Sequence, residues 1–156
     1  MTSHRERIRE AREAERRVLA ANNARAVLAH ERKALAVLAA VEDGEDRADL
    51  GLNPVTVDQL VEEARQLAPV PPGRLGRSPE HVAYRYAAGE ISREELIEAL
   101  ATWPYVPSQP ISEGLWDDYA SFTPGSFDEV QRAANLSYID DDTFEEIVQR
   151  FAQRFQ

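Results

Sequence analysis

Neither glycine nor proline occurs in this chain before Gly44. Alanine, arginine, glutamate and leucine dominate that stretch, and all four are strong helix formers. We therefore predict one helix from Ser3 to Val41, with Ser3 and Glu6 forming a capping box at its start. Such a helix is roughly 55–60 Å long. That length exceeds the diameter of a domain of this size, so part of the helix must project or pack on another chain.

The apolar residues of this stretch suggest two different halves. Half of a coiled-coil seam recurs every seven residues: Ala14, Ala21, Leu28 and Leu35. The other half of the seam reads Ala11, Val18, Arg25 and Arg32. The two arginines argue against a regular coiled coil over the full length. Residues 24–41 are apolar around much of the helix and are expected to be buried, whereas the first half is expected to be a free arm.

Charge is distributed unevenly along the chain. Residues 1–33 contain nine Lys+Arg and five Asp+Glu, a net of +4, and the remainder carries a net of −14. Opposite fields at two ends of a chain favour head-to-tail self-association or two different partners. The simpler alternative is that the basic arm folds back on its own acidic body.

A second helix and a linker follow the long helix. The second helix begins after Asn53-Pro54, with Thr56 and Gln59 as its predicted cap. Its apolar stripe is Val57, Leu60, Val61, Ala64 and Leu67. The stretch from Pro69 to Pro79 is rich in proline, glycine and arginine and is the best linker candidate.

The C-terminal part contains a near-repeat at an offset of 48 residues, in which 82–96 corresponds to 130–144. Each copy reads as a helix, a small residue, an isoleucine, a cap residue and a second helix. The corresponding pairs are Gly89 and Ser137, Ile91 and Ile139, and Ser92 and Asp140. We expect the first pair to end a helix, the second to fill the corner and the third to cap the next helix. The two copies are therefore predicted αα-hairpins.

The segments around the second copy are also expected to pack on the body. Pro104, Pro107 and Pro110 recur every three residues, as in a polyproline II helix. We interpret residues 103–110 as an ordered strap over the helical body, with the side chains of Trp103, Tyr105 and Trp116 buried beneath it. The alternative is a ligand for an aromatic groove. Further predictions are a short helix over 113–119, a cap of Ser126 with Glu129, and docking of the Phe151–Phe155 pair.

The run Tyr86-Ala-Ala-Gly-Glu-Ile-Ser-Arg-Glu-Glu-Leu96 resembles the core of the short helical-hairpin modules called SHOCT domains. The likeness covers about 20 of the 156 residues, with a weaker second copy. Leu96 stands where the family has an aromatic residue, which Phe144 supplies in the second copy. The resemblance implies a module for oligomerisation or attachment, and it implies no catalytic residue.

The sequence offers little catalytic chemistry. The chain has no cysteine, and His4, His30 and His81 lie far apart without companions at metal-ligand spacing. No phosphate-binding loop or nucleophile motif occurs. Residues 140–142 with Glu145 and Glu146 could bind a cation, but helix capping explains this cluster without one. We expect no enzyme activity, no catalytic residues, no cofactor and no metal.

Two charged regions bear on the partner. The arginines of the arm alternate with glutamates, as expected for i,i+4 pairing on an exposed helix, and no aromatic residue is interleaved. Direct binding of nucleic acid is therefore not expected. Residues 113–146 carry ten acidic residues and one basic residue. This acidic face either recognises a basic partner or only keeps the protein soluble.

Together these features predict an all-α protein, with a long N-terminal helix projecting from a small body of helical hairpins, and with a Pro-rich linker and strap. The expected divisions are 1–50 for the long helix, 51–79 for the short helix and linker, and 80–156 for the acidic hairpin domain. No apolar run reaches the roughly 20 residues of a membrane span, and no signal peptide is recognisable. We expect a cytoplasmic protein, or a virion protein if a phage encodes it.

The expected function is that of a non-enzymatic structural or adaptor subunit, acting by protein–protein interaction or self-association through the N-terminal helix. Composition resembles that of a high-GC actinobacterium or its phages, so a phage virion or assembly component is the most concrete form. The alternative is an acidic inhibitor or immunity-type protein that binds a basic enzyme. The predicted partner-binding residues are Ile8, Arg9, Arg12, Arg16, Arg17, Val18, Leu28, Leu35, Asp117, Asp118, Asp140 and Asp141.

Overall fold

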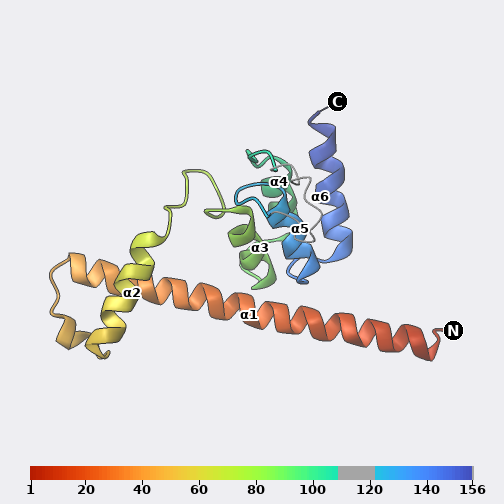
Figure 1. Ribbon diagram of the computed structural model, residues 1–156. Coiled ribbons are helices and arrows are strands. Elements are labelled where there is room, and N and C mark those ends of the chain that lie inside the picture. Colours follow the sequence, from red (N-terminus) through yellow and green to blue (C-terminus); the bar gives the residue numbers. More distant parts are fainter. Residues whose placement is uncertain (109–121, 156) are drawn as a thin grey trace, which may run out of the picture.

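A computed structural model describes residues 1–108 and 122–155 of the chain. Within these residues the elements are α1 (His4–Glu42), the 3-10 helix η1 (Arg47–Leu50), α2 (Pro54–Gln66), α3 (Pro79–Ala87), α4 (Arg93–Ala101), α5 (Asp128–Asn135) and α6 (Asp141–Gln153). The described residues contain no strand, so the all-α prediction is confirmed. Figure 1 shows the long α1 beneath a small body formed by α3 to α6, with α2 crossing near the C-terminal end of α1.

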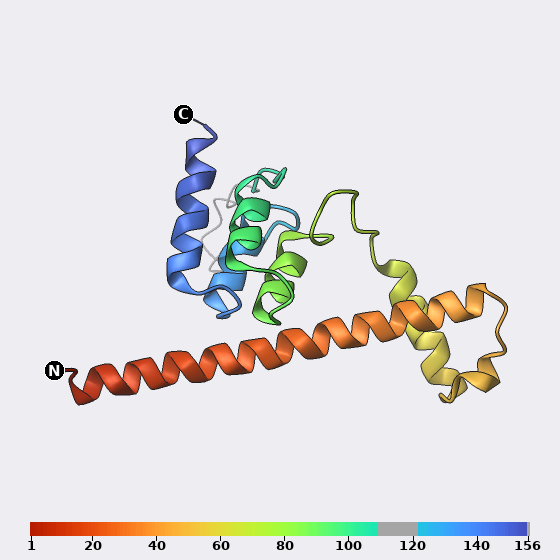
Figure 2. The same cartoon turned by 180° about the vertical axis from the view of Figure 1, so that it is seen from behind.

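The long helix is a single element, as predicted. Ser3 accepts a hydrogen bond from the Glu6 amide, and the Glu6 carboxylate accepts one from the Ser3 amide, so the capping box is formed. With 39 residues, α1 is about 58 Å long. Figures 1 and 2 show it running along the whole molecule, with the N-terminal end free of the body.

Two separate hydrophobic cores share this helix. Ala20 and Ala24 belong to the core of the body, and small side chains there allow α3 to approach closely. Ala34 and Val37 belong to a second core formed with α2. The prediction that residues 24–41 are buried is only partly correct, because the opposite side of α1 stays exposed through its alanines and Lys33. Helix α1 thus contributes residues to two separate hydrophobic cores.

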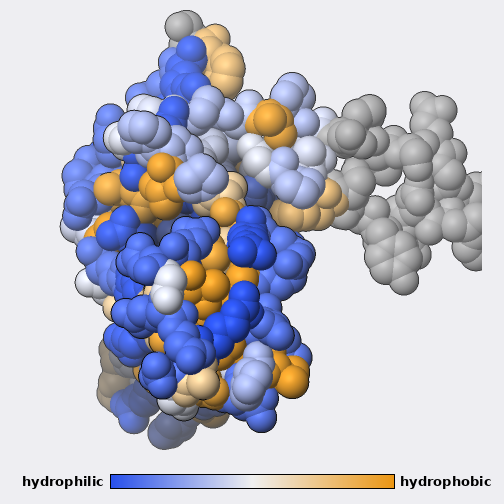
Figure 3. Space-filling view, turned by 90° about the vertical axis from the view of Figure 1, so that its left-hand side faces the viewer, coloured by the Kyte–Doolittle hydropathy of each residue, from blue (hydrophilic) through white to orange (hydrophobic). Residues whose placement is uncertain are grey.

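The core between α1 and α2 has a buried centre and a partly exposed margin. Val57, Leu60, Val61 and Ala64 form the buried face of α2, as the sequence predicted, whereas Leu67 is the C-cap beyond α2 and is only partly buried. Leu38 and Leu52 remain partly exposed at its margin. Figure 3 looks onto this end of the molecule, where apolar side chains gather between charged ones.

The predicted cap of α2 is wrong. Asn53 caps this helix, since its side-chain oxygen accepts a hydrogen bond from the Val55 amide at 2.9 Å. Pro54 occupies the first helical position, where a missing amide hydrogen costs nothing. Thr56 therefore lies inside the helix and has no capping role. An Asn-Pro start displaces the helix boundary by three residues from the one that the Thr-x-x-Gln pattern indicates.

The two hairpin corners follow the predicted pattern. Gly89 and Ser137 both have positive φ, +83° and 66°, and end α3 and α5. Ile91 and Ile139 are buried in the corners. Ser92 caps α4 through the Glu95 amide, and Asp140 caps α6 through the Thr143 amide. These three observations confirm that each copy is an αα-hairpin with the predicted corner residues.

The two hairpins pack on each other through equivalent helices. Helix α3 contacts α5, and α4 contacts α6. The Tyr86 hydroxyl donates to Asp140 at 2.7 Å, and the Arg93 guanidinium donates to Thr143 at 3.0 Å. Each bond joins one hairpin to the capping region of the other, so the near-repeat forms one shared core.

An aromatic cluster closes the body at the C-terminal side. Tyr105 lies edge-on to Phe127 and Phe151, and its hydroxyl donates to the Leu100 carbonyl. Docking of Phe151 is thus confirmed, but Phe155 is 74% exposed and contacts mainly Phe151. Trp103 is buried, as the strap interpretation requires. Trp116 and the predicted helix over 113–119 lie outside the described residues.

The predicted capping box at Ser126 and Glu129 does not form. Ser126 accepts a hydrogen bond from the Asp128 amide at 3.1 Å, so it does support the start of α5. The Glu129 carboxylate, however, accepts from the amides of Gly125 and Glu80. Glu129 therefore joins the turn before α5 to the start of α3, which is a tertiary contact that spacing alone does not reveal.

The two corners give a paired stability prediction. Gly89→Ala should lower the free energy of unfolding by about 1 kcal/mol, because alanine is strained at positive φ. An added Cβ at Gly89 meets no atom within 4 Å, so crowding does not contribute. Ser137→Gly should raise the free energy of unfolding, by up to about 1 kcal/mol, for the same reason. Urea unfolding measures both changes, and two shifts of the same sign would contradict the strain argument.

Candidate interaction surfaces

The N-terminal arm, defined as residues 4–19 of α1, is exposed on all its sides. Its large apolar side chains are Ile8, Val18 and Leu19, which are 54%, 59% and 59% exposed. The first buried residue of α1 is Ala20. A free helix of this length is only marginally stable in water, so the arm depends on its continuity with the buried part of α1.

Most charges of the arm have no partner within the described chain. The predicted i,i+4 pairing is largely absent, since Arg9 and Glu13 form its one ion pair among the described residues, at 3.9 Å. The other arginines have no ion-pair partner there: Arg5, Arg7, Arg12, Arg16 and Arg17. The arm therefore presents open charges of both signs together with exposed apolar groups.

The structure places the predicted partner-binding residues of α1 in two groups. Those of the arm are all exposed: Ile8, Arg9, Arg12, Arg16, Arg17 and Val18. Leu28 is only 2% exposed and packs inside the protein, so no partner can reach it in this structure. Leu35 is 39% exposed on the half of α1 that carries α2. Heptad spacing placed Val18, Leu28 and Leu35 on one predicted seam, but it did not distinguish buried Leu28 from exposed Val18 and Leu35.

A groove separates the arm from the corner between α5 and α6. Glu13, Arg16 and Arg17 line its arm side. The opposite wall consists of residues 134–142, including Asp140, Asp141 and Asp142. No ion pair joins the two walls among the described residues. Arginines of the arm and aspartates of the body thus lie on opposite walls of the groove without forming ion pairs. The arm lies alongside the acidic body, as the fold-back alternative expects, but it does not bind to it through these charges.

The groove continues toward an apolar rim. Leu19 of the arm and Leu136 at the end of α5 line this part, together with Asn23 and Tyr138. Leu136 is 56% exposed. The Asn23 amide donates to the Tyr138 hydroxyl and fixes the floor of the groove. The sequence did not indicate this rim, because Leu19 lies outside the heptad seam and Leu136 is not one of the corner residues of the near-repeat.

The acidic residues predicted to meet a partner differ in their availability. Asp140 accepts hydrogen bonds from Tyr86 and Thr143. Burial raises the pKa of Asp140, but these hydrogen bonds outweigh burial and hold its pKa below the usual range. The Asp140 carboxylate therefore has a structural role, in which it caps α6 and binds Tyr86. Asp141 is exposed at the first turn of α6, whereas Asp117 and Asp118 lie outside the described residues.

A largely buried polar cluster of Glu31, Arg77 and His81 fixes α1 to the body. Glu31 of α1 binds the Arg77 guanidinium at 2.6 Å and the His81 ring nitrogen Nε2 at 3.2 Å. The other ring nitrogen, Nδ1, accepts from the Arg77 amide at 3.2 Å. Because Nδ1 accepts, Nε2 carries the proton and donates it to Glu31. The neutral form of His81 thus satisfies both of its neighbours.

The pKa values of this cluster agree with the geometry. Burial lowers the pKa of His81, the charge of Glu31 raises it, and the charges of Arg77 and Arg85 lower it again, so the net shift is downward. Burial raises the pKa of Glu31, but Arg77 and His81 outweigh burial and hold it below the usual range. The folded chain therefore favours ionised Glu31 beside neutral His81.

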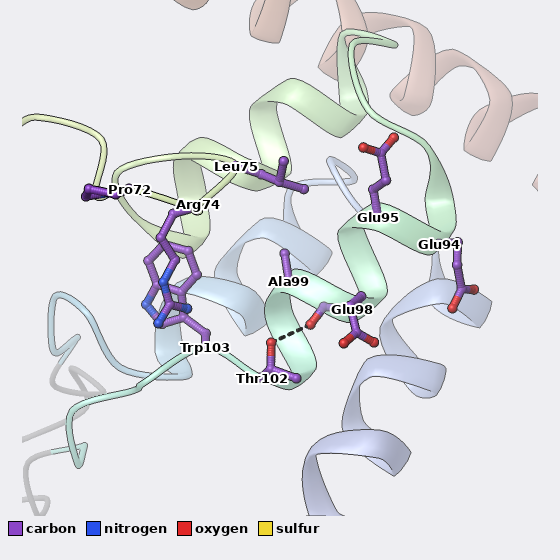
Figure 4. Close-up of a pocket in the computed structure, with 10 residues that line it drawn as sticks. Pro72, Arg74, Leu75, Glu94, Glu95, Glu98, Ala99, Thr102 and Trp103 are labelled. Atoms are coloured by element: carbon purple, nitrogen blue, oxygen red, sulfur yellow. Dashed lines mark hydrogen bonds between the residues drawn. The ribbon is translucent and has the colours of Figure 1, made fainter.

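A separate hollow of about 810 Å³ lies beside α4 (Figure 4). Arg74 stacks on the Trp103 ring, with its guanidinium carbon 5.0 Å from the ring centre. Two of the carboxylates on the α4 side are already engaged, Glu95 in the cap of α4 and Glu94 with Arg150 at 2.8 Å. The chain itself thus occupies the Trp103 ring and two of the three carboxylates that line the hollow, while the Glu98 carboxylate forms no ion pair among the described residues.

No group of three or more histidine, aspartate or glutamate side chains is placed to hold a metal ion within residues 1–108 and 122–155. None of the helices described there is both long enough and apolar enough to cross a membrane.

The His81 cluster predicts a pH dependence of stability. Since the pKa of His81 is lower in the folded chain, its contribution to stability is complete above the ordinary histidine pKa of about 6.5 and is lost as the pH falls. Lowering the pH from 7.5 to 5.5 should therefore reduce the free energy of urea unfolding. The contribution of Glu31 is lost only in more acidic solution, below its usual pKa of 4.5.

The variant His81→Gln should flatten this dependence, because glutamine cannot titrate. His4→Gln is the matched control, since His4 is an exposed histidine on α1 with no ion pair or hydrogen bond among the described residues, whereas His30 pairs with Glu63 at 2.7 Å. An equal loss of stability with pH in the wild type and in His81→Gln would show that His81 does not cause it.

Compared with known proteins, the chain matches no family model, no curated protein and no solved structure. A function for the chain is therefore inferred from its own contacts, charges and exposed faces.

Proposed function

We propose that this protein is a non-enzymatic helical subunit or adaptor that joins a larger assembly through its N-terminal arm. One observation carries the proposal. Residues 4–19 form more than four turns of regular helix that touch nothing else in the described chain closely enough to be buried. A helix with this many open charges and exposed aliphatic groups is suited to binding another protein chain.

The attachment of the arm supports this role. Ala20 and Ala24 are packed in the body core, and Glu31 is bound to Arg77 and His81. The helix that carries the arm is therefore fixed at several points before it leaves the body. A partner that binds the arm gains a rigid connection to the body, and loses little entropy in ordering it.

The hairpin body supports the same role indirectly. SHOCT-type modules, which each copy of the near-repeat resembles, are thought to act in oligomerisation or attachment. Here the two copies already pack on each other through α3 with α5 and α4 with α6. The surfaces through which the two copies could associate with other modules are thus buried within one chain. The arm, in contrast, stays exposed on all its sides. A phage virion or assembly component is the most concrete form of this proposal.

The acidic-inhibitor alternative has weaker support. Asp140 is engaged by Tyr86 and Thr143. Among the carboxylates expected to form that surface, Asp128 accepts from the Thr123 amide and the Ser108 hydroxyl. Two of the acidic groups that an enzyme would have to recognise therefore already serve the fold.

Site-specific photo-crosslinking tests the proposed function. A photoreactive benzoylphenylalanine at Ala11, in the arm, should cross-link to one defined partner chain when the full protein is expressed in its own host. Ala29 provides a matched control, because it is also an exposed alanine of α1 and lies five helical turns further on, pointing in the same direction.

A defined cross-linked band at position 11, identified by mass spectrometry and absent at position 29, is the expected result. Either no band at position 11, or the same bands at both positions, would show that the arm is not the interaction surface. Thermal melts of both variants check that the body is folded.

A further inference from the structure

One face of the arm has a self-complementary order of residues. Ile8, Arg12, Glu15 and Leu19 are separated by four, three and four residues, so they lie in one line along α1. This alternation of four and three is the spacing of a coiled-coil seam. All four side chains are exposed, and the line lies on a different face from Ala20 and Ala24, which pack on the body.

The order along this line is apolar, positive, negative, apolar. In an antiparallel pair of identical helices, the register that sets Ile8 opposite Leu19 also sets Arg12 opposite Glu15. The two-fold symmetry repeats each contact, which gives two apolar layers outside two layers of opposite charge. A parallel pair in register would place Arg12 against Arg12 and Glu15 against Glu15, and like charges in contact are unfavourable.

We propose that the partner of the arm is the arm of a second copy, bound antiparallel with Ile8 opposite Leu19 and Arg12 opposite Glu15. This inference rests on the proposed function and names its partner. Residues 4–23 of the two copies then overlap over about 30 Å. Ala11 and Val18 lie beside the seam and extend its apolar contact.

The charges of the seam are available for this contact. Neither Arg12 nor Glu15 has an ion-pair partner or hydrogen bond among the described residues, although both belong to an ordered helix. Arg9 and Glu13, which do pair, lie off the seam. Pairing across the dimer would therefore form contacts without breaking any that exist in the single chain.

The groove beside the arm is continuous with the proposed seam. Arg16 lines the hollow along Ile8 and Arg12, and it also lines both parts of the groove at the α5–α6 corner. In the proposed register the N-terminal end of the second arm reaches this corner. Its basic residues would then approach exposed Asp141, and Leu136 would cover the end of the apolar layer. The opposite net charges of arm and body favour this approach.

Charge exchange across the seam tests the proposal. Light scattering of the purified full chain should give twice the monomer mass of 17.5 kDa. Arg12→Glu alone, or Glu15→Arg alone, should raise the dimer dissociation constant at least about tenfold, because each change creates like-charge contacts. The double variant Arg12→Glu/Glu15→Arg should restore the dimer. Arg7→Glu is the matched control, since Arg7 is exposed on another face of the arm and should have little effect.

Disulfide trapping tests the direction and register independently, because the chain contains no cysteine. A mixture of Ile8→Cys and Leu19→Cys chains should form a covalent dimer on oxidation. Each variant alone should form it much more slowly, since identical positions lie far apart in an antiparallel pair. All substitutions are at exposed positions of the arm, and circular dichroism checks that each variant is folded.

The outcomes separate this inference from the proposed function. A monomer at all concentrations, or rapid self-linking of Ile8→Cys alone, overturns the antiparallel second copy. Failure of the double charge exchange to restore a dimer lost in the single variants also overturns it. If a monomeric chain still cross-links to a different protein at Ala11, the proposed function stands and only the identity of the partner is wrong.

Discussion

The rest of the structure depends on the continuity of α1. One core lies between α1 and α2, another lies among the four hairpin helices, and the same uninterrupted helix contributes alanines to both. Between the two cores, Glu31 binds Arg77 and His81, and Arg32 binds Glu90 at 2.5 Å. These polar contacts therefore fix α1 to the body between its two hydrophobic cores. Without that helix, α2 would have no apolar surface to cover and the body would lose one wall of its core.

The hairpin body is closed by its own internal packing, whereas the arm is not packed against it. Two similar hairpins fill each other's apolar faces, and hydrogen bonds such as Tyr86 to Asp140 join them. An arrangement that two separate chains could form is thus completed inside one chain. The part of α1 that extends past the body is exposed on all its sides. The chain combines a closed, internally paired domain with an open helix of mixed charge.

Local sequence patterns predicted most of the fold. Helix formers without glycine or proline defined α1, and the Gly89 and Ser137 corners defined the hairpins, because these features act within a few residues. The sequence did not reveal which face of α1 the body covers, since alanines occur all around the helix. It also did not reveal the His81 cluster or the role of Glu129, whose partners are distant along the chain. The sequence therefore indicated which segment of α1 is a candidate interaction surface, but not which face of the helix is exposed.

The absence of glycine and proline from α1 has a mechanical consequence. A straight helix of 3.6 residues per turn fixes both the spacing and the angular direction of everything attached to it. The arm and the α2 end therefore cannot turn independently: a rotation imposed on one is passed to the other. Helix α1 would therefore hold a partner at residues 4–19 and any contact around α2 at a fixed distance and a fixed angle from each other, with the hairpin body between them.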